Sequence, residues 1–106
     1  MNNMKRINNY GDIFWYKEGT EILHKENGPA VEQADGNKFW LKEGKYHRED
    51  GPAVEYANGD KHWYLNGLCH REDGPAKEYV NGTVEFWMNG FQGNSLDELI
   101  IKNILE

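Results

Sequence analysis

Residues 47–53 read His-Arg-Glu-Asp-Gly-Pro-Ala, and the same pattern stands at residues 24–30 and 70–76, with Lys and Asn as substitutes in the first copy. The step from one copy to the next is 23 residues each time. A fixed period of roughly 20–50 residues is the signature of a repeat architecture, in which each copy is one supersecondary unit. We therefore expect residues shared by all copies to build the fold.

Within one copy, the residues around the repeated pattern predict two strands and two tight turns. Residues 61–65 are rich in aromatic and branched side chains, which favour a strand, and the Asn66-Gly67 pair after them is a strong hairpin signal. The return strand begins at residue 68 and is interrupted by a corner at residues 71–75, because Pro75 has no N–H to donate. An extended path then leads to a second hairpin turn at Asn81-Gly82.

These short connections decide the fold class. Parallel strands need crossover connections of about a dozen residues or more, which the repeat spacing does not leave. We expect an all-β repeat, a single-layer twisted antiparallel meander of about seven or eight short strands built from 23-residue double-strand units. The repeated Trp position, which runs Trp15, Trp40, Trp63 and then Phe86, is expected to form a continuous apolar spine along one face.

The C-terminal segment has a different pattern. Ser95 and Glu98 have the spacing of a helix capping box, and Leu96 and Leu99 begin an apolar stripe at helical spacing. We expect residues 95–105 to form a helix that caps the open edge of the sheet or covers one of its faces. The alternative is a homodimer contact through this helix.

Composition limits the broad class of protein. The 106 residues fit a single domain over 1–106, with the repeats over roughly residues 9–93. No apolar run approaches the ~20 residues of a membrane span, and the N-terminus leads into no apolar stretch, so neither membrane insertion nor a signal peptide is expected. Cys69 is the only cysteine, which excludes a disulfide within the chain and favours a cytoplasmic location.

Charge also limits the partners. The formal net charge is −6, and it is concentrated in residues 72–106, which hold 2 basic and 7 acidic groups. Nucleic-acid binding relies on Lys and Arg neutralising phosphates, so no direct nucleic-acid partner is expected. The acidic part permits a basic protein partner, and its simplest interpretation is solubility.

The repeated histidines do not predict a metal site. His24, His47 and His70 are equivalent positions two strands apart, so they are expected about 10 Å from one another. Zinc ligands each lie about 2.0–2.1 Å from one ion, so these three side chains cannot share it. We expect structural histidines that pair with a neighbouring carboxylate or turn carbonyl.

Catalytic groups are equally hard to assemble. Cys69 and His70 are adjacent in a strand, so their side chains point to opposite faces. A ladder of equivalent glutamates, Glu32, Glu55 and Glu78, does not supply the two different environments of an acid–base pair. We therefore expect no enzyme, no cofactor and no metal. The Arg-Glu-Asp loops at 48–50 and 71–73 are expected to form local salt bridges or to present a polar rim to a partner.

The positions beside the repeated Trp are where the copies differ. They carry large side chains on the face opposite the Trp residues, and a single layer has too little protein to bury both of its faces. An uncovered aromatic row with a charged rim is typical of a binding site. The alternative is that sheet twist and the C-terminal helix bury the row. The predicted partner-binding residues are Phe14, Tyr16, Phe39, Leu41, His62, Tyr64 and Trp87.

The order of these motifs resembles a known repeat family. Trp-x-x-Asn-Gly-x-x-His, followed by Gly and then Tyr-x-Asn-Gly at a period of 23, resembles the MORN repeat (membrane occupation and recognition nexus). The usual His-Gly-x-Gly is replaced here by His-Arg-Glu-Asp-Gly-Pro-Ala, a variant that looks like repeats of large phages, giant viruses and some bacteria. The resemblance covers roughly residues 9–93 and implies a scaffold for protein contacts.

Three functions follow as hypotheses. The first is a non-catalytic protein-binding module, in its specific form a small phage or viral accessory protein that binds and inhibits a host protein, such as a defence factor, in the host cytoplasm. The second is a small-ligand binder, for instance a nucleotide sponge that stacks bases on the aromatic row. The third is a structural module that assembles with itself.

Overall fold

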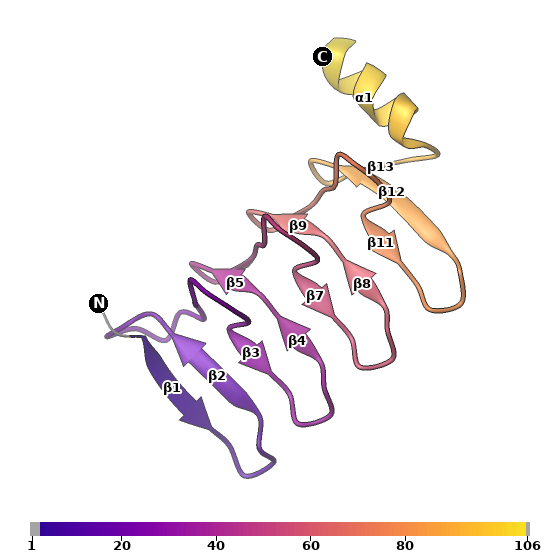
Figure 1. The fold of residues 1–106 in the computed structure, drawn as a ribbon. Helices are drawn as coiled ribbons and strands as arrows, with labels where there is room; N and C mark the ends of the chain where they lie inside the picture. Colours follow the sequence, from indigo (N-terminus) through magenta and orange to yellow (C-terminus); the bar gives the residue numbers. More distant parts are fainter. Residues whose placement is uncertain (1–2, 106) are drawn as a thin grey trace.

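The computed structural model describes residues 3–105, apart from the side chains of residues 103–105. Its main element is an antiparallel sheet in which nine strands follow one another in chain order (Figure 1). The expected open meander is confirmed, and the described part of the chain is thin, with extents of 46 × 31 × 17 Å. The strands are β1 (Met4–Ile7), β2 (Ile13–Tyr16), β3 (Val31–Glu32), β4 (Lys38–Phe39), β7 (Val54–Glu55), β8 (Lys61–His62), β11 (Lys77–Glu78), β12 (Val84–Met88) and β13 (Phe91–Gly93).

Two further hairpins lie beside this sheet and form small sheets of their own. One pairs β5 (Leu41–Lys42) with β6 (Lys45–Tyr46), and the other pairs β9 (Tyr64–Leu65) with β10 (Leu68–Cys69). They are separate because the long strand changes partner at Trp63. The Trp63 N–H donates to the carbonyl of Ala76 at 2.7 Å, and the Trp63 carbonyl accepts the N–H of His70 at 3.1 Å. The first strand of a unit is therefore divided at its Trp, and the return strand is interrupted between β10 and β11, as the sequence predicts.

The first hairpin turn of a unit has the backbone conformation that its sequence predicts, whereas at the second, Asn81-Gly82, only Gly82 has positive φ, at 92°. Asn66 and Gly67 both have positive φ, 50° and 81°, as a type I′ turn requires. Glu43 adopts the same left-handed conformation at the equivalent position, with a φ of 51°. The glutamate is accommodated there because the turn is held by neighbouring units, as the contacts of His24 show.

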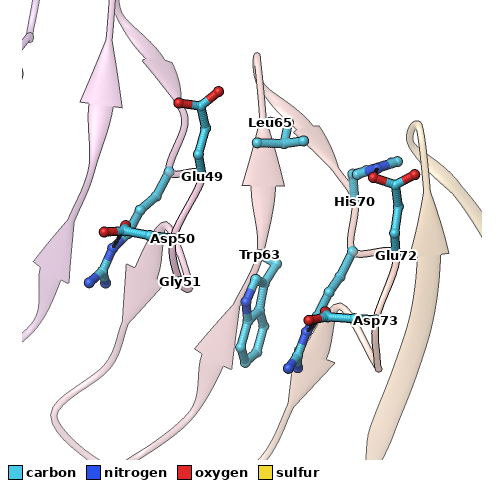
Figure 2. Close-up of a pocket in the computed structure, with 10 residues that line it drawn as sticks. Glu49, Asp50, Gly51, Trp63, Leu65, His70, Glu72 and Asp73 are labelled. Carbon is cyan, nitrogen blue, oxygen red and sulfur yellow. Dashed lines mark hydrogen bonds and ion pairs between the residues drawn. The ribbon is translucent and has the colours of Figure 1, made fainter.

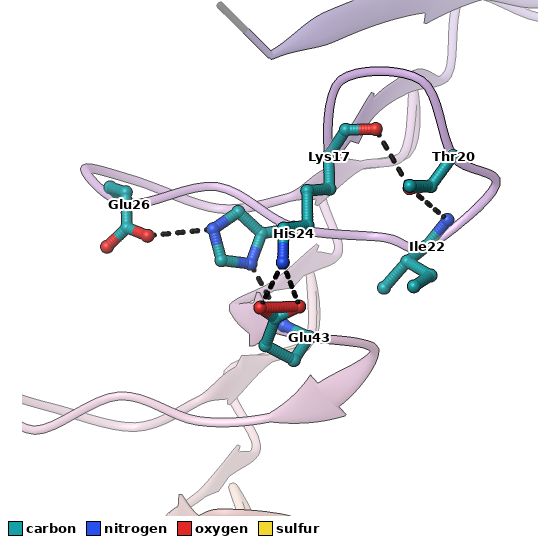
Figure 3. Close-up of polar contacts among 6 residues, drawn as sticks. All are labelled: Lys17, Thr20, Ile22, His24, Glu26 and Glu43. Atoms are coloured by element: carbon teal, nitrogen blue, oxygen red, sulfur yellow. Dashed lines mark hydrogen bonds and ion pairs between the residues drawn. The ribbon is translucent and has the colours of Figure 1, made fainter. Parts of the chain in front are cut away.

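The repeated histidines join each unit to the next. The Nδ1 atoms of His24, His47 and His70 accept the backbone N–H of Glu43, Asn66 and Asn89, at 2.9 Å in each case. In the first unit, His24 Nε2 also contacts Glu26 Oε1 at 2.7 Å (Figure 3). The expected structural role is confirmed. The partner in the turn is an N–H group and not a carbonyl, because the left-handed turn residue directs its N–H toward the preceding unit.

A second ladder joins the units at their opposite ends. Side-chain oxygens of one turn accept a backbone N–H from the next turn along the sheet: Ala34 donates to Asp12, Ala57 to Asn37, and Val80 to Asp60, at 2.7, 2.7 and 2.8 Å. Bonds to Asp12 lower the pKa of its carboxyl group, chiefly through the Ala34 N–H. The sheet is thus held together at both ends of each unit.

The first unit contains the two extra residues expected within 20–23. They form a small loop in which the Thr20 hydroxyl donates to the Lys17 carbonyl at 2.8 Å and accepts the Ile22 N–H at 3.0 Å (Figure 3). Lys17 Nζ then reaches Glu43 Oε1 of the next unit at 2.6 Å. The insertion is absorbed locally, so the register of the later units is unchanged.

The chain ends in α1 (Leu96–Leu105), as the capping-box spacing predicts. The Ser95 hydroxyl accepts the Glu98 N–H at 3.2 Å, and Glu98 Oε2 accepts the N–H of Asn94 at 3.3 Å. Leu99 is only 2 % exposed and packs against Gly93 of β13. The helix contacts β12 and β13 and lies beyond the last hairpin (Figure 1), so it caps the end of the sheet and does not cover a face.

Within residues 3–105, no helix is both long enough and apolar enough to cross a membrane.

Candidate functional site: two faces of the sheet

The strand register separates the side chains into two faces. Phe14 lies opposite Val31, Val31 opposite Phe39, and Phe39 opposite Val54, which in turn faces His62. Directly opposed residues of antiparallel strands point to the same side, and neighbours along a strand point to opposite sides. We call the side with Phe14, Phe39 and His62 the aromatic face, and the side with the repeated Trp residues the Trp face.

All seven predicted partner-binding residues lie on the aromatic face. Six of them are half-buried: Phe14, Tyr16, Phe39, His62, Tyr64 and Trp87. Leu41 is only 7 % exposed, because it packs with Ala30 and Val31 in the core cluster. Leu41 therefore belongs to the core, and its expected role as a partner-contact residue is corrected.

Three tyrosines that were not predicted from the sequence extend this row. Tyr46 bridges Tyr64 and Phe39, with ring centroids 5.3 and 6.1 Å away. The other two, Tyr56 and Tyr79, flank His62 with centroids at 5.4 and 5.6 Å. The signal for Tyr56 and Tyr79 was present, because they occupy one repeat position 23 residues apart. Tyr46 could be found only from the hairpin register, which places it opposite Leu41.

The aromatic face becomes more polar toward the C-terminus. The Tyr79 hydroxyl donates to Glu85 Oε2 at 3.1 Å, and the Trp87 indole donates to Glu85 Oε1 at 2.8 Å. The bond from Trp87 lowers the pKa of the Glu85 carboxyl. Burial lowers the pKa of His62, whose Nε2 is buried without a partner among the described residues. Burial also raises the pKa of Tyr64 to about 12.

The Trp face is built differently from what the sequence predicts. Each Trp is covered by a cation from the corner of its own unit, with the charge of Lys25, Arg48 and Arg71 lying 4.3, 3.9 and 3.9 Å from the ring of Trp15, Trp40 and Trp63. The expected continuous apolar spine is therefore wrong. The Trp side chains share one face, but corner cations lie over their rings.

The corner loops form the expected local salt bridges. Arg48 Nε donates to Asp50 at 3.1 Å and Arg71 Nε donates to Asp73 at 2.9 Å. Each guanidinium also donates to the carbonyl of the proline that closes its corner, Pro52 or Pro75. These bonds and the stacking on Trp hold both arginines in one orientation.

Two hollows lie between successive corners on the Trp face. The larger, of about 600 Å³, has Trp63 and Leu65 between the corner at 48–51 and the corner at 70–73 (Figure 2). The second, of about 550 Å³, has Trp40 and Lys42 between the preceding pair of corners. Every lining residue of the second hollow is 23 positions before one of the first, so the two are equivalent sites of neighbouring repeats.

The described residues offer little for catalysis. Cys69 is buried, and burial raises the pKa of its thiol to about 11, which disfavours a nucleophilic thiolate at neutral pH. The neighbouring His70 already uses Nδ1 to accept the Asn89 N–H. No group of three or more His, Cys, Asp or Glu among residues 3–105 is arranged to hold a metal ion.

Comparison with protein-family models, with curated proteins and with solved structures finds no match to this chain. The resemblance to MORN repeats therefore stays a prediction that rests on the residues themselves.

Proposed function

We propose that this protein is a non-catalytic protein-binding repeat module that contacts its partner through the aromatic face. The observation that carries the proposal is the unbroken chain of ring contacts from Tyr64 through Tyr46, Phe39 and Tyr56 to His62. Two of these rings stay accessible, with Tyr46 37 % and Tyr56 36 % exposed. Tyrosine is enriched at interface hot spots, because a rigid ring buries much area and its hydroxyl still finds a hydrogen-bond partner.

The arrangement of the helix supports this proposal. Because α1 packs on β12 and β13 at the end of the sheet, it does not lie over β4 and β8, the strands that carry Phe39 and His62 (Figure 1). Hydrogen bonds join the units at both ends, and they stabilise the sheet without a second layer over this face. This supports a contact through the two exposed tyrosines of the row, Tyr46 and Tyr56.

A narrower form of the proposal is that the partner is a host protein inhibited by a phage or viral accessory protein in the host cytoplasm. It rests on the resemblance of the corner sequence to repeats of phages and giant viruses, and on the acidic C-terminal third of the chain. An inhibitor of this kind would bind its target at a fixed stoichiometry.

The test is a pull-down from bacterial lysate with three baits. The wild-type chain and the Glu49→Gln/Glu72→Gln variant, which changes only the Trp face, should each recover the same stoichiometric partner. The Tyr46→Ser/Tyr56→Ser variant should lose it while keeping its circular dichroism spectrum, because both tyrosines are among the more exposed of the row. Equal recovery by all three baits would show that the contact lies elsewhere, and recovery of no stoichiometric partner would count against protein binding.

Self-assembly is the second candidate, and it is favoured by the open N-terminal edge. β1 pairs only with β2 among the described strands, so its outer backbone groups are available to another strand. Light scattering that reports a strict monomer at high concentration would remove this candidate.

The nucleotide-sponge alternative predicts thermal stabilisation by nucleotides, and a screen without any shift in melting temperature would remove it.

A further inference from the structure

We propose that the Trp face binds a second kind of partner, an extended basic peptide whose Lys or Arg side chains enter successive hollows, one per repeat. The inference goes beyond the proposed function, because it concerns the opposite face of the sheet and does not depend on the aromatic row. It is carried by the shape, the charge and the spacing of the two hollows between the corners.

The two hollows have equivalent linings in neighbouring repeats, and each lies between two corners. In the larger hollow, the corners with Asp50 and Asp73 stand on either side of Trp63 and Leu65 (Figure 2). Volumes of about 600 and 550 Å³ lie within the range of roughly 300–1,000 Å³ that is usual for ligand sites. An aromatic ring beside the hollow suits the aliphatic stem of a Lys or Arg side chain, which packs along apolar surface.

The charge of the larger hollow favours a cationic side chain. Both arginines of the larger hollow are committed to the protein, since Arg71 donates to Asp73, to Glu78 and to the Pro75 carbonyl while it stacks on Trp63. The carboxylates remain accessible at the rim: the side chains of Asp50, Asp73 and Glu72 are 88, 85 and 77 % exposed. Four carboxylates against two guanidinium groups line this hollow, so an anionic ligand would be repelled.

The spacing selects an extended chain. Equivalent positions lie two strands apart, which is about 10 Å. In a polyproline II conformation, which rises about 3.1 Å per residue with about three residues per turn, every third side chain points to the same side. Basic residues at every third position then repeat about every 9 Å, close to the step between the hollows. The smaller hollow carries Lys42 where the larger has Leu65 and Asn27 where the larger has Asp50, so its three carboxylates are balanced by three cationic side chains. The site around Trp63 should therefore bind the basic side chain more tightly, and the smaller hollow should add a weaker second contact.

The test uses three unlabelled twelve-residue peptides in NMR titrations of the isotope-labelled full chain. The first repeats Lys-Ser-Ser, the second has the same composition with its four lysines adjacent, and the third repeats Glu-Ser-Ser. The first should shift the indole signals of Trp40 and Trp63 and bind about three- to tenfold more tightly than the second, because only its charges match the hollows. The third should not bind.

Variants locate the contact. Glu49→Gln/Glu72→Gln should weaken binding of the spaced lysine peptide about three- to tenfold, whereas Glu18→Gln, which removes an exposed carboxylate that lines neither hollow, should leave it unchanged. Tyr46→Ser/Tyr56→Ser should also leave it unchanged, which separates this proposal from the aromatic face. Equal affinity for the two lysine peptides, or equal weakening by Glu18→Gln, would overturn the proposal in favour of nonspecific attraction. Absence of any indole shift would overturn it directly.

Discussion

The two faces of the sheet are made by the same strands, yet they use the repeat in opposite ways. On the Trp face, each unit repeats a Trp with a corner cation stacked over it. On the aromatic face, the equivalent positions hold Phe14, Phe39, His62 and Glu85, and the chemistry changes from apolar to polar along the molecule. The stacked Trp and its corner cation therefore repeat on one face, whereas the position beside the Trp on the other face varies from unit to unit.

The largest expected effect on stability comes from removing a Trp side chain from the Trp face. Trp63→Ala should lower the free energy of unfolding by about 3 kcal/mol, because it removes a half-buried indole and the stacking partner of Arg71. Urea denaturation measures the loss. The matched change on the other face, Tyr56→Ser, should cost about 1 kcal/mol or less, since that ring is 36 % exposed. Equal losses would contradict the division of roles between the faces.

The next effect separates the end cap from both faces. A Cβ at Gly93 would lie 2.6 Å from Leu99 Cγ, so Gly93→Ala should displace α1 and cost about 1–3 kcal/mol through overpacking. Hydrogen exchange should then show loss of protection in α1 but not in β4 or β8. Loss of protection across the whole sheet would mean that the helix supports the faces as well as the end.

A smaller effect tests the links between units. His70→Ala removes the acceptor for the Asn89 N–H and should cost about 1 kcal/mol, the usual net worth of a neutral hydrogen bond. His47→Ala, which removes the equivalent acceptor of the Asn66 N–H, should cost a similar amount. Thermal unfolding measures both variants, and no loss in either would argue against the histidine ladder.

The smallest effect is a pH dependence confined to the aromatic face. Burial lowers the pKa of His62, so the unfolded chain takes up a proton near pH 6.5 while the folded protein takes it up only at lower pH. The stability contribution of neutral His62 is therefore present above about pH 6.5 and is lost as the pH falls below it. His62→Phe, which restores the residue of the earlier units, should remove this part of the pH dependence. Unfolding measured at pH 8 and pH 5.5 would show the difference, and an unchanged slope would refute it.

Much of the fold could be predicted because its signals are local. Positive φ at Asn66 and Gly67, the interruption at Pro75 and the cap at Ser95 each depend on a few adjacent residues. The division of the strand at Trp63 could not be predicted, because it depends on two different partners of one residue: the Trp63 N–H donates to the Ala76 carbonyl, and the Trp63 carbonyl accepts the His70 N–H. For the same reason, the expected number of strands was too small.

The candidate site was predicted in part. Alternation along the strands placed Phe39, His62 and Tyr64 on one face without any structure, since successive side chains point to opposite sides. Leu41 was assigned to the surface because its sequence position is equivalent to that of Tyr64. In the fold it is only 7 % exposed, since Ala30 and Val31 of the neighbouring strand pack against it.

By itself, the sequence determined the repeat, the turn types, the antiparallel order and the helix, because these follow from residues that are neighbours in the chain. Only the tertiary structure decided what covers the Trp rings, which tyrosines complete the aromatic face and where α1 lies. Those contacts join residues that lie on different strands and turns, and their geometry depends on how each strand divides between two partners. The corner at 47–53 shows both contributions. Its sequence identifies the repeat, and only in the fold does its Arg48 stack on Trp40 and line the two hollows of the Trp face.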